Sequence, residues 1–515
     1  MTEAAVVSSS DLMRLRGLLT ATGPGMELIS PVSGEVIGEL PTSTAADVEV
    51  GAQIAHRAQQ EWAARPIEER AEVLLHFHDH LLDQRDYFVD LLQAAGKDRL
   101  SAVLEVFHVA LTARYYGRTA RRYLRSERAE GVLPLVTRVE RHYVPRGLVG
   151  VIGPWNYPLT MAISDGLAAL VAGNAIMLKP DHQTPLVPLA AVELLRTAGL
   201  PADLWQVVHG RGPVVGRELI DVSDYVCFTG STATGRIVAA QCAGRLIGCS
   251  LELGGKNPMV ILDDADVEAA AEGAARASFS SAGQLCVSTE RIYVAEPIFE
   301  QFTQAFVRRT EAIQIGNAAD FGCDMGSLIS HDQMARVSGH VEDARSKGAT
   351  VLTGGRRRTD IGELCYEPTI LTGVTPEMDC YADETFGPVV SVYPVANEAE
   401  AVARANDSDY GLNASVWTSN AARGRRVASK IKCGSVNVNE GFAATFGSID
   451  APMGGMKNSG LARRQGRDGI RRFVDVQSVA TQSGVPLAPS HGLDAKSFTS
   501  VMTGVLRVMK KVGRA

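Results

Sequence analysis

One cysteine of this chain stands in a setting suited to nucleophilic catalysis. The stretch "FSSAGQLCVSTER", residues 279–291, places Cys286 after a small and flexible approach. A thiolate attacks an electrophilic carbon readily, and a thioester formed from it remains open to hydrolysis. The chain has eight cysteines, and a buried structural thiol is the competing interpretation. This stretch alone leaves both interpretations open.

Two other polar residues could serve the same chemistry. "VIGPWNYPLT" places Asn156 in a proline-bracketed loop after a strand, where its amide could donate to an oxyanion. "LELGGKNPMVI" places Glu252 in a strand before two glycines, where a carboxylate could act as a base on water. A turn asparagine and an exposed strand carboxylate are the ordinary alternatives.

A glycine-containing loop suggests a phosphate site. "CFTGSTATG" puts Gly230 and Gly235 between an apolar strand and the start of a helix, where free N–H groups suit phosphate. Arg236 and Ile237 follow, so the loop is not a Walker A motif, and it also lacks the GxGxxG spacing. Lys179 ends another strand in "LKPDHQTP", free to bind a ribose or a phosphate. A plain strand-to-helix turn and a solvated lysine remain the alternatives.

Two histidines have the spacing of metal ligands on a helix. His76 and His80 share one helical face in "LLHFHDHLL". Asp79 and Glu69 do not complete a third ligand position, so we expect no metal.

The elements that must position these residues alternate along the chain. Residues 47–124 have helical periodicity, and "GLVGVIG", "NAIMLK", "WQVVHG" and "YVCFTG" then alternate with helical segments. That succession predicts a parallel, doubly wound α/β sheet. A second series runs from "PMVILDDAD" through "RIYVA", "TVLTGG", "PTILTGV" and "VVSVYPV" to "SVNVNE", so we expect a domain change near Gly255. "LPLVTRVERHYVPRG" alternates and predicts a hairpin.

Composition restricts the class of protein. A chain of 515 residues predicts two or more domains, and 45% hydrophobic residues with 21% charged residues are typical of a soluble α/β protein. A net charge of −7 and a pI near 5.9 argue against nucleic acid as a partner. The cysteines form no CxxC pair, which favours reduced thiols in a cytoplasm. We find no secretory signal and no apolar run of about 18 residues.

The C-terminal segment has a pattern of its own. "SFTSVMTGVLRVMKKVGRA" predicts a basic amphipathic helix, with apolar residues on one face and lysines and arginines elsewhere. We expect it to pack against this subunit or a neighbouring one, and a membrane-surface role is the alternative.

Seven motifs together resemble one known family. "PWNYPL", "LKP" with "QTP", "FTGSTATG", "LELGGKNP", "GQLC", "ETFGPV" and "PMGGMKNSGL" occur in the order and approximate spacing of the NAD(P)-dependent aldehyde dehydrogenase superfamily. The resemblance covers about residues 30–480. Within the family the chain looks most like a divergent bacterial branch called succinate-semialdehyde dehydrogenase.

The resemblance implies a role for each of the three candidate residues. Cys286 would be the nucleophile, and Asn156 with the Cys286 backbone N–H would stabilise the oxyanion. Glu252 would activate the hydrolytic water. CoA-acylating relatives lack a glutamate at this position, so a free carboxylic acid is the expected product.

The same resemblance implies a dinucleotide site without a metal. Many NAD-preferring members carry a glutamate three residues after the strand lysine, and this chain has His182 there. A 2′-phosphate would meet no like charge, and a protonated imidazole could attract it, so we expect NADP, with NAD as the alternative. The expected cofactor residues are Trp155, Lys179, His182, Gly230, Ser231, Gly235, Leu253, Glu384 and Phe386.

The substrate is the least determined part of this prediction. Ser164 and Ser280 stand where some succinate-semialdehyde dehydrogenases have carboxylate-binding arginines. Succinate semialdehyde is still the expected substrate. Tyr157, Phe442 and Phe446 near the pocket keep an aliphatic or aromatic aldehyde open, and a CoA-acylating or reductase relative is a further alternative.

The resemblance also implies an architecture. We expect a Rossmann-type cofactor domain at 1–125 and 147–254 and a doubly wound catalytic domain at 255–460. A β oligomerisation arm is expected at 126–146 and 461–485, and a tail with the amphipathic helix at 486–515. Pairing of "LPLVTRVERHY" with "FVDVQSVATQ" in the arm predicts a homodimer or homotetramer.

Overall fold

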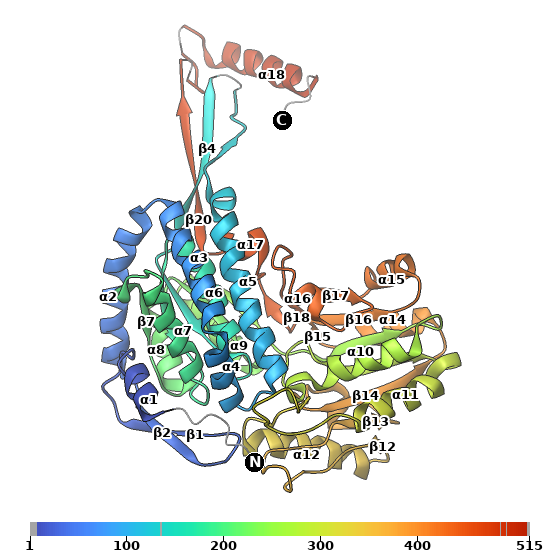
Figure 1. The fold of residues 1–515 in the computed structure, drawn as a ribbon. Coiled ribbons are helices and arrows are strands. Elements are labelled where there is room, and N and C mark those ends of the chain that lie inside the picture. Colours follow the sequence, from blue (N-terminus) through green and yellow to red (C-terminus); the bar gives the residue numbers. More distant parts are fainter. Residues whose placement is uncertain (1–7, 134–135, 485, 491, 512–515) are drawn as a thin grey trace.

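The protein consists of two lobes, each built on its own sheet, and an arm that projects from the first lobe (Figure 1). The computed structural model describes residues 8–133, 136–484, 486–490 and 492–511. The chain passes from the first sheet to the second between residues 252 and 257. The two lobes have separate apolar cores, and the loops that end their strands face each other.

The first sheet has six strands in the order β19-β9-β8-β5-β6-β7. The five strands β5 to β9 are parallel, as the alternating pattern predicts, and β19 joins the edge antiparallel to β9. These strands are short apolar runs buried on both faces, which is typical of parallel sheets covered by helices. Their bounds are β5 (Leu148–Ile152), β6 (Ala175–Lys179), β7 (Trp205–Val207), β8 (Tyr225–Thr229), β9 (Gly248–Glu252) and β19 (Gly460–Leu461).

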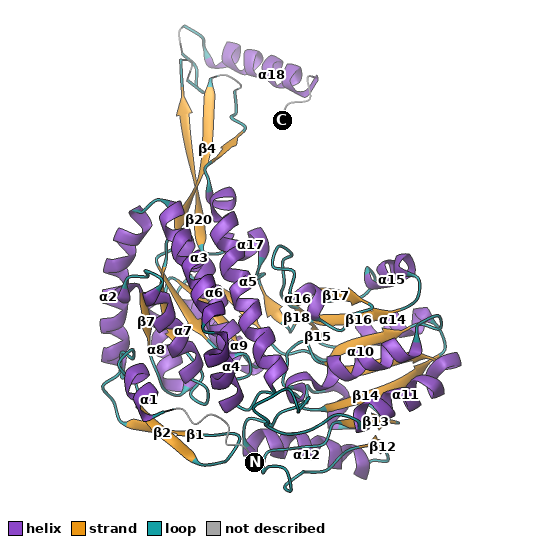
Figure 2. Ribbon diagram, in the orientation of Figure 1, coloured by secondary structure: helices purple, strands orange, loops and turns teal. Residues whose placement is uncertain are grey.

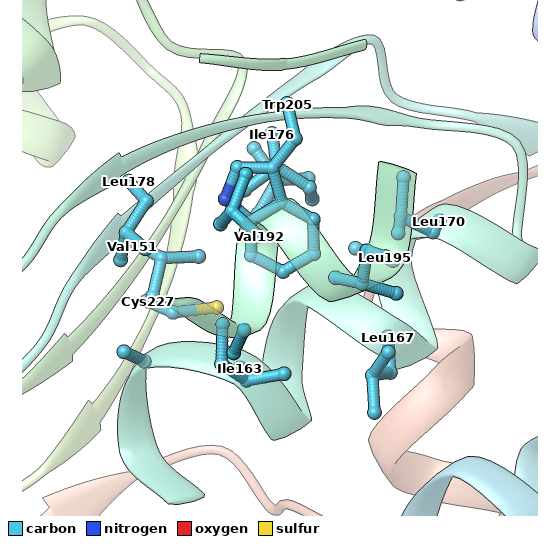
Figure 3. Packing of buried hydrophobic residues seen from close by; sticks show 14 of the residues in the cluster. Val151, Ile163, Leu167, Leu170, Ile176, Leu178, Val192, Leu195, Trp205 and Cys227 are labelled. Carbon is cyan, nitrogen blue, oxygen red and sulfur yellow. The ribbon is translucent and has the colours of Figure 1, made fainter. Parts of the chain in front are cut away.

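Helices cover this sheet on both faces (Figure 2). The periodic stretch after residue 45 forms four consecutive helices, and Thr44 starts the first of them with a capping box to Asp47. The core beneath them packs Ile163 of α6 and Val192 of α7 with the sheet residues Val151, Ile176 and Trp205 (Figure 3). The helices are α1 (Ser9–Arg16), α2 (Ala45–Ala64), α3 (Ile67–Asp83), α4 (Arg85–Ala94), α5 (Arg99–Leu124), α6 (Pro158–Val171), α7 (Leu186–Thr197), α8 (Arg217–Val222) and α9 (Thr232–Gly244).

The second sheet has seven strands in the order β12-β13-β14-β11-β10-β16-β17. All neighbours are parallel except β12 and β13. Sequence patterning located six of these strands and missed β16. The strands are β10 (Asn257–Ile261), β11 (Thr289–Ala295), β12 (Thr350–Thr353), β13 (Thr369–Thr372), β14 (Val389–Val395), β16 (Asn413–Trp417) and β17 (Ser435–Val438). The helices are α10 (Val267–Phe279), α11 (Phe299–Glu311), α12 (His331–Ser346), α13 (Asp379–Ala382), α14 (Glu398–Asn406), α15 (Ala421–Ala428) and α16 (Ala443–Phe446).

The arm contains β3 (Glu127–Ala129), β4 (Thr137–Pro145) and β20 (Val474–Gln482). The expected pairing of β4 with β20 is present and antiparallel, from Val474 opposite Pro145 to Gln482 opposite Thr137. The prediction of a hairpin within 133–147 is wrong for those residues of the segment that the structure describes. Residues 137–145 form one long strand, β4, whose neighbour in the chain that pairs with it is the short β3. β20 lies at the sheet edge and is exposed along eight of its nine residues.

A helix lies at the tip of the arm (Figure 1). The expected C-terminal helix is α18 (Ala495–Lys511), and α17 (Gly466–Arg471) precedes β20 at the base of the arm. No helix among the described residues is both long and apolar enough to span a bilayer. The remaining small pairs are β1 (Gly25–Ile29) with β2 (Val36–Pro41) and β15 (Tyr410–Gly411) with β18 (Met456–Lys457).

Candidate active site

A cavity of about 210 Å³ lies where the strand-ending loops of the two lobes meet. Its wall combines the loop after β5, the ends of β8 and β9, and the segment before β11. Open parallel sheets bind ligands at this carboxyl edge of their strands. The cavity brings together twelve of the residues expected from the sequence: Trp155, Asn156, Tyr157, Gly230, Ser231, Glu252, Leu253, Cys286, Glu384, Phe386, Phe442 and Phe446.

Cys286 is partly exposed in the wall of this cavity. The turn before it places Ser281 and Ala282 at positive φ, of 50° and 55°, which bends the chain sharply toward the cavity. The Asn257 side-chain amide donates to the carbonyls of Cys286 and Ser288, each at 2.8 Å. Burial, with the negative charge of Glu252 next in effect, raises the pKa of the Cys286 thiol to about 12. The Cys286 thiol is therefore protonated near neutral pH.

Asn156 lies beside the cysteine loop. Its side-chain Nδ2 donates to the Gln284 carbonyl at 2.8 Å, two residues before Cys286. Gln284 is itself fixed, because its amide donates to the Ser327 carbonyl at 3.1 Å and accepts from the Ile329 N–H at 3.0 Å. The arrangement places an amide donor beside the loop that carries Cys286.

The loop that carries Asn156 is held by a buried ion pair. Glu105 on α5 accepts from the N–H groups of Leu159 and Thr160, both at 2.9 Å, at the start of α6. Lys97 forms an ion pair with Glu105 at 2.6 Å and lies 3.3 Å from the ring centre of Tyr157. A carboxylate at a helix N-terminus is stabilising, and this one fixes the direction in which the Asn156 loop enters α6.

Glu252 is the last residue of β9 and is buried at the cavity. Its Oε1 has no hydrogen-bond partner, which is costly for a buried carboxylate oxygen. Burial raises the pKa of Glu252 to about 7, with Arg464 opposing the shift. A carboxyl group with a pKa near neutrality and a free oxygen has the properties of a general base.

Two glycines beside the residues expected to bind the cofactor leave no room for a side chain. A Cβ at Gly254 would lie 2.3 Å from the Glu384 carboxylate, and one at Gly235 would lie 2.4 Å from Leu253. Gly230 and Ser231 line the cavity at the start of α9, and the Ser231 side chain caps that helix. Small residues at a helix N-terminus fit the diphosphate of a dinucleotide.

The residues expected at the nicotinamide end are fixed from the second lobe. The Gly255 N–H donates to the Glu384 carboxylate at 2.7 Å. Burial raises the pKa of Glu384 to about 8, and the nearby charge of Glu290 contributes. Glu290 accepts from the Phe386 N–H at 3.0 Å and holds its backbone at a φ of 55°. The Phe386 ring then meets Trp155 edge to face, with 5.4 Å between ring centres.

The adenosine end shows one departure from the expected chemistry. Lys179 is buried at the end of β6, donates to the Pro180 carbonyl at 3.0 Å, and has its pKa lowered by burial. His182 is half-buried, and burial also lowers its pKa, so the imidazole is neutral near pH 7. The expected attraction by a protonated His182 is therefore not supported. Arg211, an exposed residue whose charge acts on His182, is not among the residues expected from the sequence.

Two expected substrate residues do not line the main cavity. Ser164 is buried on α6 and faces a smaller cavity behind Phe446. Ser280 turns its hydroxyl back onto α10, where it donates to the Arg276 carbonyl at 2.7 Å. Neither Ser164 nor Ser280 therefore shares the main cavity with Tyr157, Phe442 and Phe446, as had been expected. Among the described residues, no group of three or more His, Cys, Asp and Glu side chains could hold a metal.

Sequence reasoning missed the residues that support the site. Asn257 is part of the motif "LELGGKNP", but nothing in that motif indicates that its amide would donate to the loop that carries Cys286. Lys256 and Glu290 form a buried ion pair at 2.5 Å, and Glu290 also binds the backbone of Thr385. These contacts join β10, β11 and the loop before β14, so no local spacing could reveal them.

Comparison with known proteins agrees with this geometry. The sequence profile described as "Aldehyde dehydrogenase family" matches residues 19–479. The chain belongs to the aldehyde dehydrogenase family. As a member, this aldehyde dehydrogenase oxidises an aldehyde to the carboxylic acid with NAD(P) as hydride acceptor.

Relatives and solved structures resemble the enzyme over most of its length. A protein of Mycolicibacterium smegmatis named "Putative succinate-semialdehyde dehydrogenase (NADP+)" is 48% identical over 98% of this chain and 99% of its own. A crystal structure titled as an Escherichia coli NADP-dependent enzyme has a TM-score of 0.85 at 32% identity, covering 89% of this chain and 95% of its own. Betaine aldehyde dehydrogenase of Staphylococcus aureus with NAD+ has a TM-score of 0.87 at 30% identity, covering 93% and 98%.

Proposed function

We propose that this aldehyde dehydrogenase converts its substrate to the free acid through Cys286, with Asn156 and Glu252 as the other catalytic residues. The Cys286 thiol loses its proton to water and its sulfur attacks the aldehyde carbon, and the Asn156 amide with the Cys286 N–H stabilises the resulting oxyanion. A nicotinamide held beside Glu384 and Phe386 would supply the acceptor for the hydride that leaves the former aldehyde carbon. The thioester left on Cys286 is then cleaved by water, from which Glu252 takes the proton.

The observation that carries this proposal is the Glu252 carboxyl in the cavity that also contains Cys286. Its free Oε1 and its raised pKa of about 7 match a base that works near neutral pH. A CoA-acylating relative needs no such base, because a thiol replaces water as the second nucleophile. The buried carboxyl therefore favours hydrolysis over thiol transfer.

We further propose NADP as the preferred cofactor and succinate semialdehyde as the natural substrate. Lys179 and Arg211 are the cations available to a 2′-phosphate, and position 182 carries no carboxylate. The relatives' names support both choices. We also propose that the enzyme is a homodimer or homotetramer formed through the exposed β20 edge and that it acts in the cytoplasm.

The deciding experiment offers a panel of aldehydes to the enzyme with NAD or NADP, without CoA. We expect reduced nicotinamide and free acid in equal amounts, and loss of both in Cys286→Ala. The variant should still bind NADP, which fluorescence titration would check. Turnover that requires CoA, or wild-type turnover by Cys286→Ala, would contradict the proposal.

A further inference from the structure

Two thiols lie next to each other where α9 turns back into β9. Cys242 is in the last turn of the helix, and Cys249 is the second residue of the strand. The Cys242 thiol donates a hydrogen bond to the Cys249 sulfur. Neither residue lines the active-site cavity, and the proposed reaction gives neither of them a role. The pair is therefore a feature separate from the chemistry at Cys286.

The turn between the two cysteines is fixed by a helix-capping motif. The Ile247 N–H donates to the Cys242 carbonyl at 3.1 Å. The Leu246 N–H donates to the Ala243 carbonyl, also at 3.1 Å. These are the two hydrogen bonds of a Schellman motif, in which Leu246 takes the left-handed conformation at a φ of 57°. Because β9 then packs back along α9, Cys242, four residues before Leu246, lies opposite Cys249, three residues after it.

The two thiols differ in exposure and in acidity. Cys242 is 1% exposed, whereas Cys249 is partly exposed. The hydrogen bond from Cys242 lowers the pKa of Cys249, and burial opposes this shift. The same hydrogen bond raises the pKa of Cys242, and burial adds to the effect. Cys249 is therefore the thiol that forms a thiolate and meets an oxidant first, with a protonated thiol directly behind it.

Metal binding does not account for the pair. Within the described part of the chain, no further His, Cys, Asp or Glu joins the two thiols in a group that could hold a metal ion. Two thiolates are also fewer than the four ligands of a structural zinc site. A thiolate-forming cysteine in contact with a second thiol is instead the arrangement that condenses to a disulfide after oxidation.

We propose that Cys242 and Cys249 form a site of reversible oxidation, at which a hydroperoxide converts the two thiols into a disulfide. The Cys249 thiolate attacks one oxygen of the hydroperoxide and the O–O bond breaks. That oxygen stays on the Cys249 sulfur as a sulfenic acid, and the other oxygen leaves as an alcohol or water. The Cys242 sulfur then attacks the Cys249 sulfur, so that the S–S bond forms and the S–O bond breaks. The proton of Cys242 leaves with the hydroxide as water. A low-molecular-weight thiol reverses the oxidation by exchange.

The pair should react before Cys286. Burial raises the pKa of the Cys286 thiol to about 12, whereas the pKa of Cys249 is lowered by its hydrogen bond from Cys242. The thiolate is the form that attacks an oxidant, and Cys249 has the larger fraction of it near neutral pH. Mild oxidation should therefore join Cys242 to Cys249 while Cys286 remains a free thiol.

The test uses peptide mapping, because Arg245 lies between the two cysteines and trypsin cleaves there. The folded full-length enzyme is treated with a small excess of hydrogen peroxide, alkylated with iodoacetamide and digested without reduction. Mass spectrometry should find peptides 237–245 and 246–256 joined, and lighter than their sum by two hydrogen atoms. Dithiothreitol should separate them. Peptide 277–291, which contains Cys286, should still be alkylated.

Variants and controls show which thiol reacts first. In Cys242→Ser, dimedone, which reacts with sulfenic acids, should label Cys249. Cys323→Ser, which removes another partly exposed thiol, should leave the joined peptides unchanged. Thermal melting before and after treatment shows whether the enzyme is folded, and the wild-type digest carries the test if Cys242→Ser does not fold.

Three results would overturn the proposal. The first is that both peptides remain alkylated at the highest peroxide concentration that leaves the enzyme folded. The second is that Cys286 is oxidised before the two peptides are joined. The third is that dimedone does not label Cys249 in folded Cys242→Ser. None of these results depends on aldehyde oxidation, so they leave the proposed function untouched.

Discussion

Replacing Glu252 by glutamine tests the hydrolytic step most directly. The substitution keeps the size of the side chain but removes the carboxylate that would accept a proton from water. General base catalysis typically contributes about 10²- to 10⁴-fold to a rate, so we expect thioester hydrolysis to slow by that factor. Formation of the thioester on Cys286 does not require Glu252, so acyl-enzyme should accumulate in the variant.

The pH dependence follows from the raised pKa. A carboxyl group with a pKa of about 7 is ionised to about one tenth at pH 6 and about nine tenths at pH 8. Because the ionised form is the base, hydrolysis in the wild type should rise about tenfold between these pH values and then level off. The Cys286 thiol has a pKa of about 12, so its reactivity should continue to rise above pH 8. A plateau in the rate above pH 8 would therefore show that the Glu252 carboxyl, and not the Cys286 thiol, determines the pH dependence.

The assay mixes enzyme, NADP and aldehyde, stops the reaction in acid, and follows the acyl-enzyme by intact mass. The wild type should show decay of the adduct with an inflection near pH 7, and Glu252→Gln should show slow decay without it. Glu300→Gln, an exposed residue on α11, is the matched control and should behave as the wild type. Decay that is independent of pH from 6 to 8, or fast decay in Glu252→Gln, would refute the assignment.

Three further predictions concern other parts of the molecule. Asn156→Ala removes an oxyanion donor and should lower kcat about 10²- to 10³-fold with little change in KM, measured by steady-state kinetics. Arg211→Ala should raise KM for NADP at least severalfold more than KM for NAD; equal changes would exclude a contact with the 2′-phosphate. Val476→Asp with Val479→Asp, on the exposed β20 edge, should lower the mass measured by light scattering, because charges on an edge strand oppose pairing. An unchanged mass would remove β20 from the interface.

Much of the fold was predictable because it depends on local patterns. The parallel strands of the first sheet are apolar runs of five or fewer residues between helical segments, and the pattern located each of them. The strand β16 was missed because "NASVW" contains polar residues whose contacts are distant in sequence. Asn413, for example, donates to the carbonyls of Val287 and Gly441.

The site was predictable in part, and for a different reason. Cys286, Asn156 and Glu252 were found from motif order, and the structure brings all three to one cavity. The neutral state of His182 depends on burial by the fold, which the sequence does not display. The positions of Ser164 and Ser280 were assigned by analogy, and only the helix faces of α6 and α10 decide where their hydroxyl groups point.

The pairing of β4 with β20 has a consequence for how the chain is made. Ile470, Phe473 and Val474 belong to the core of the first lobe, together with residues from its first helices. Most of that core therefore leaves the ribosome before Ile470, Phe473 and Val474, which complete the core, are translated. The whole second lobe also leaves the ribosome before them. Until then β4 has a single short local partner and presents an unpaired edge. The nascent first lobe should thus be a chaperone client until translation ends, and subunits should assemble only after release.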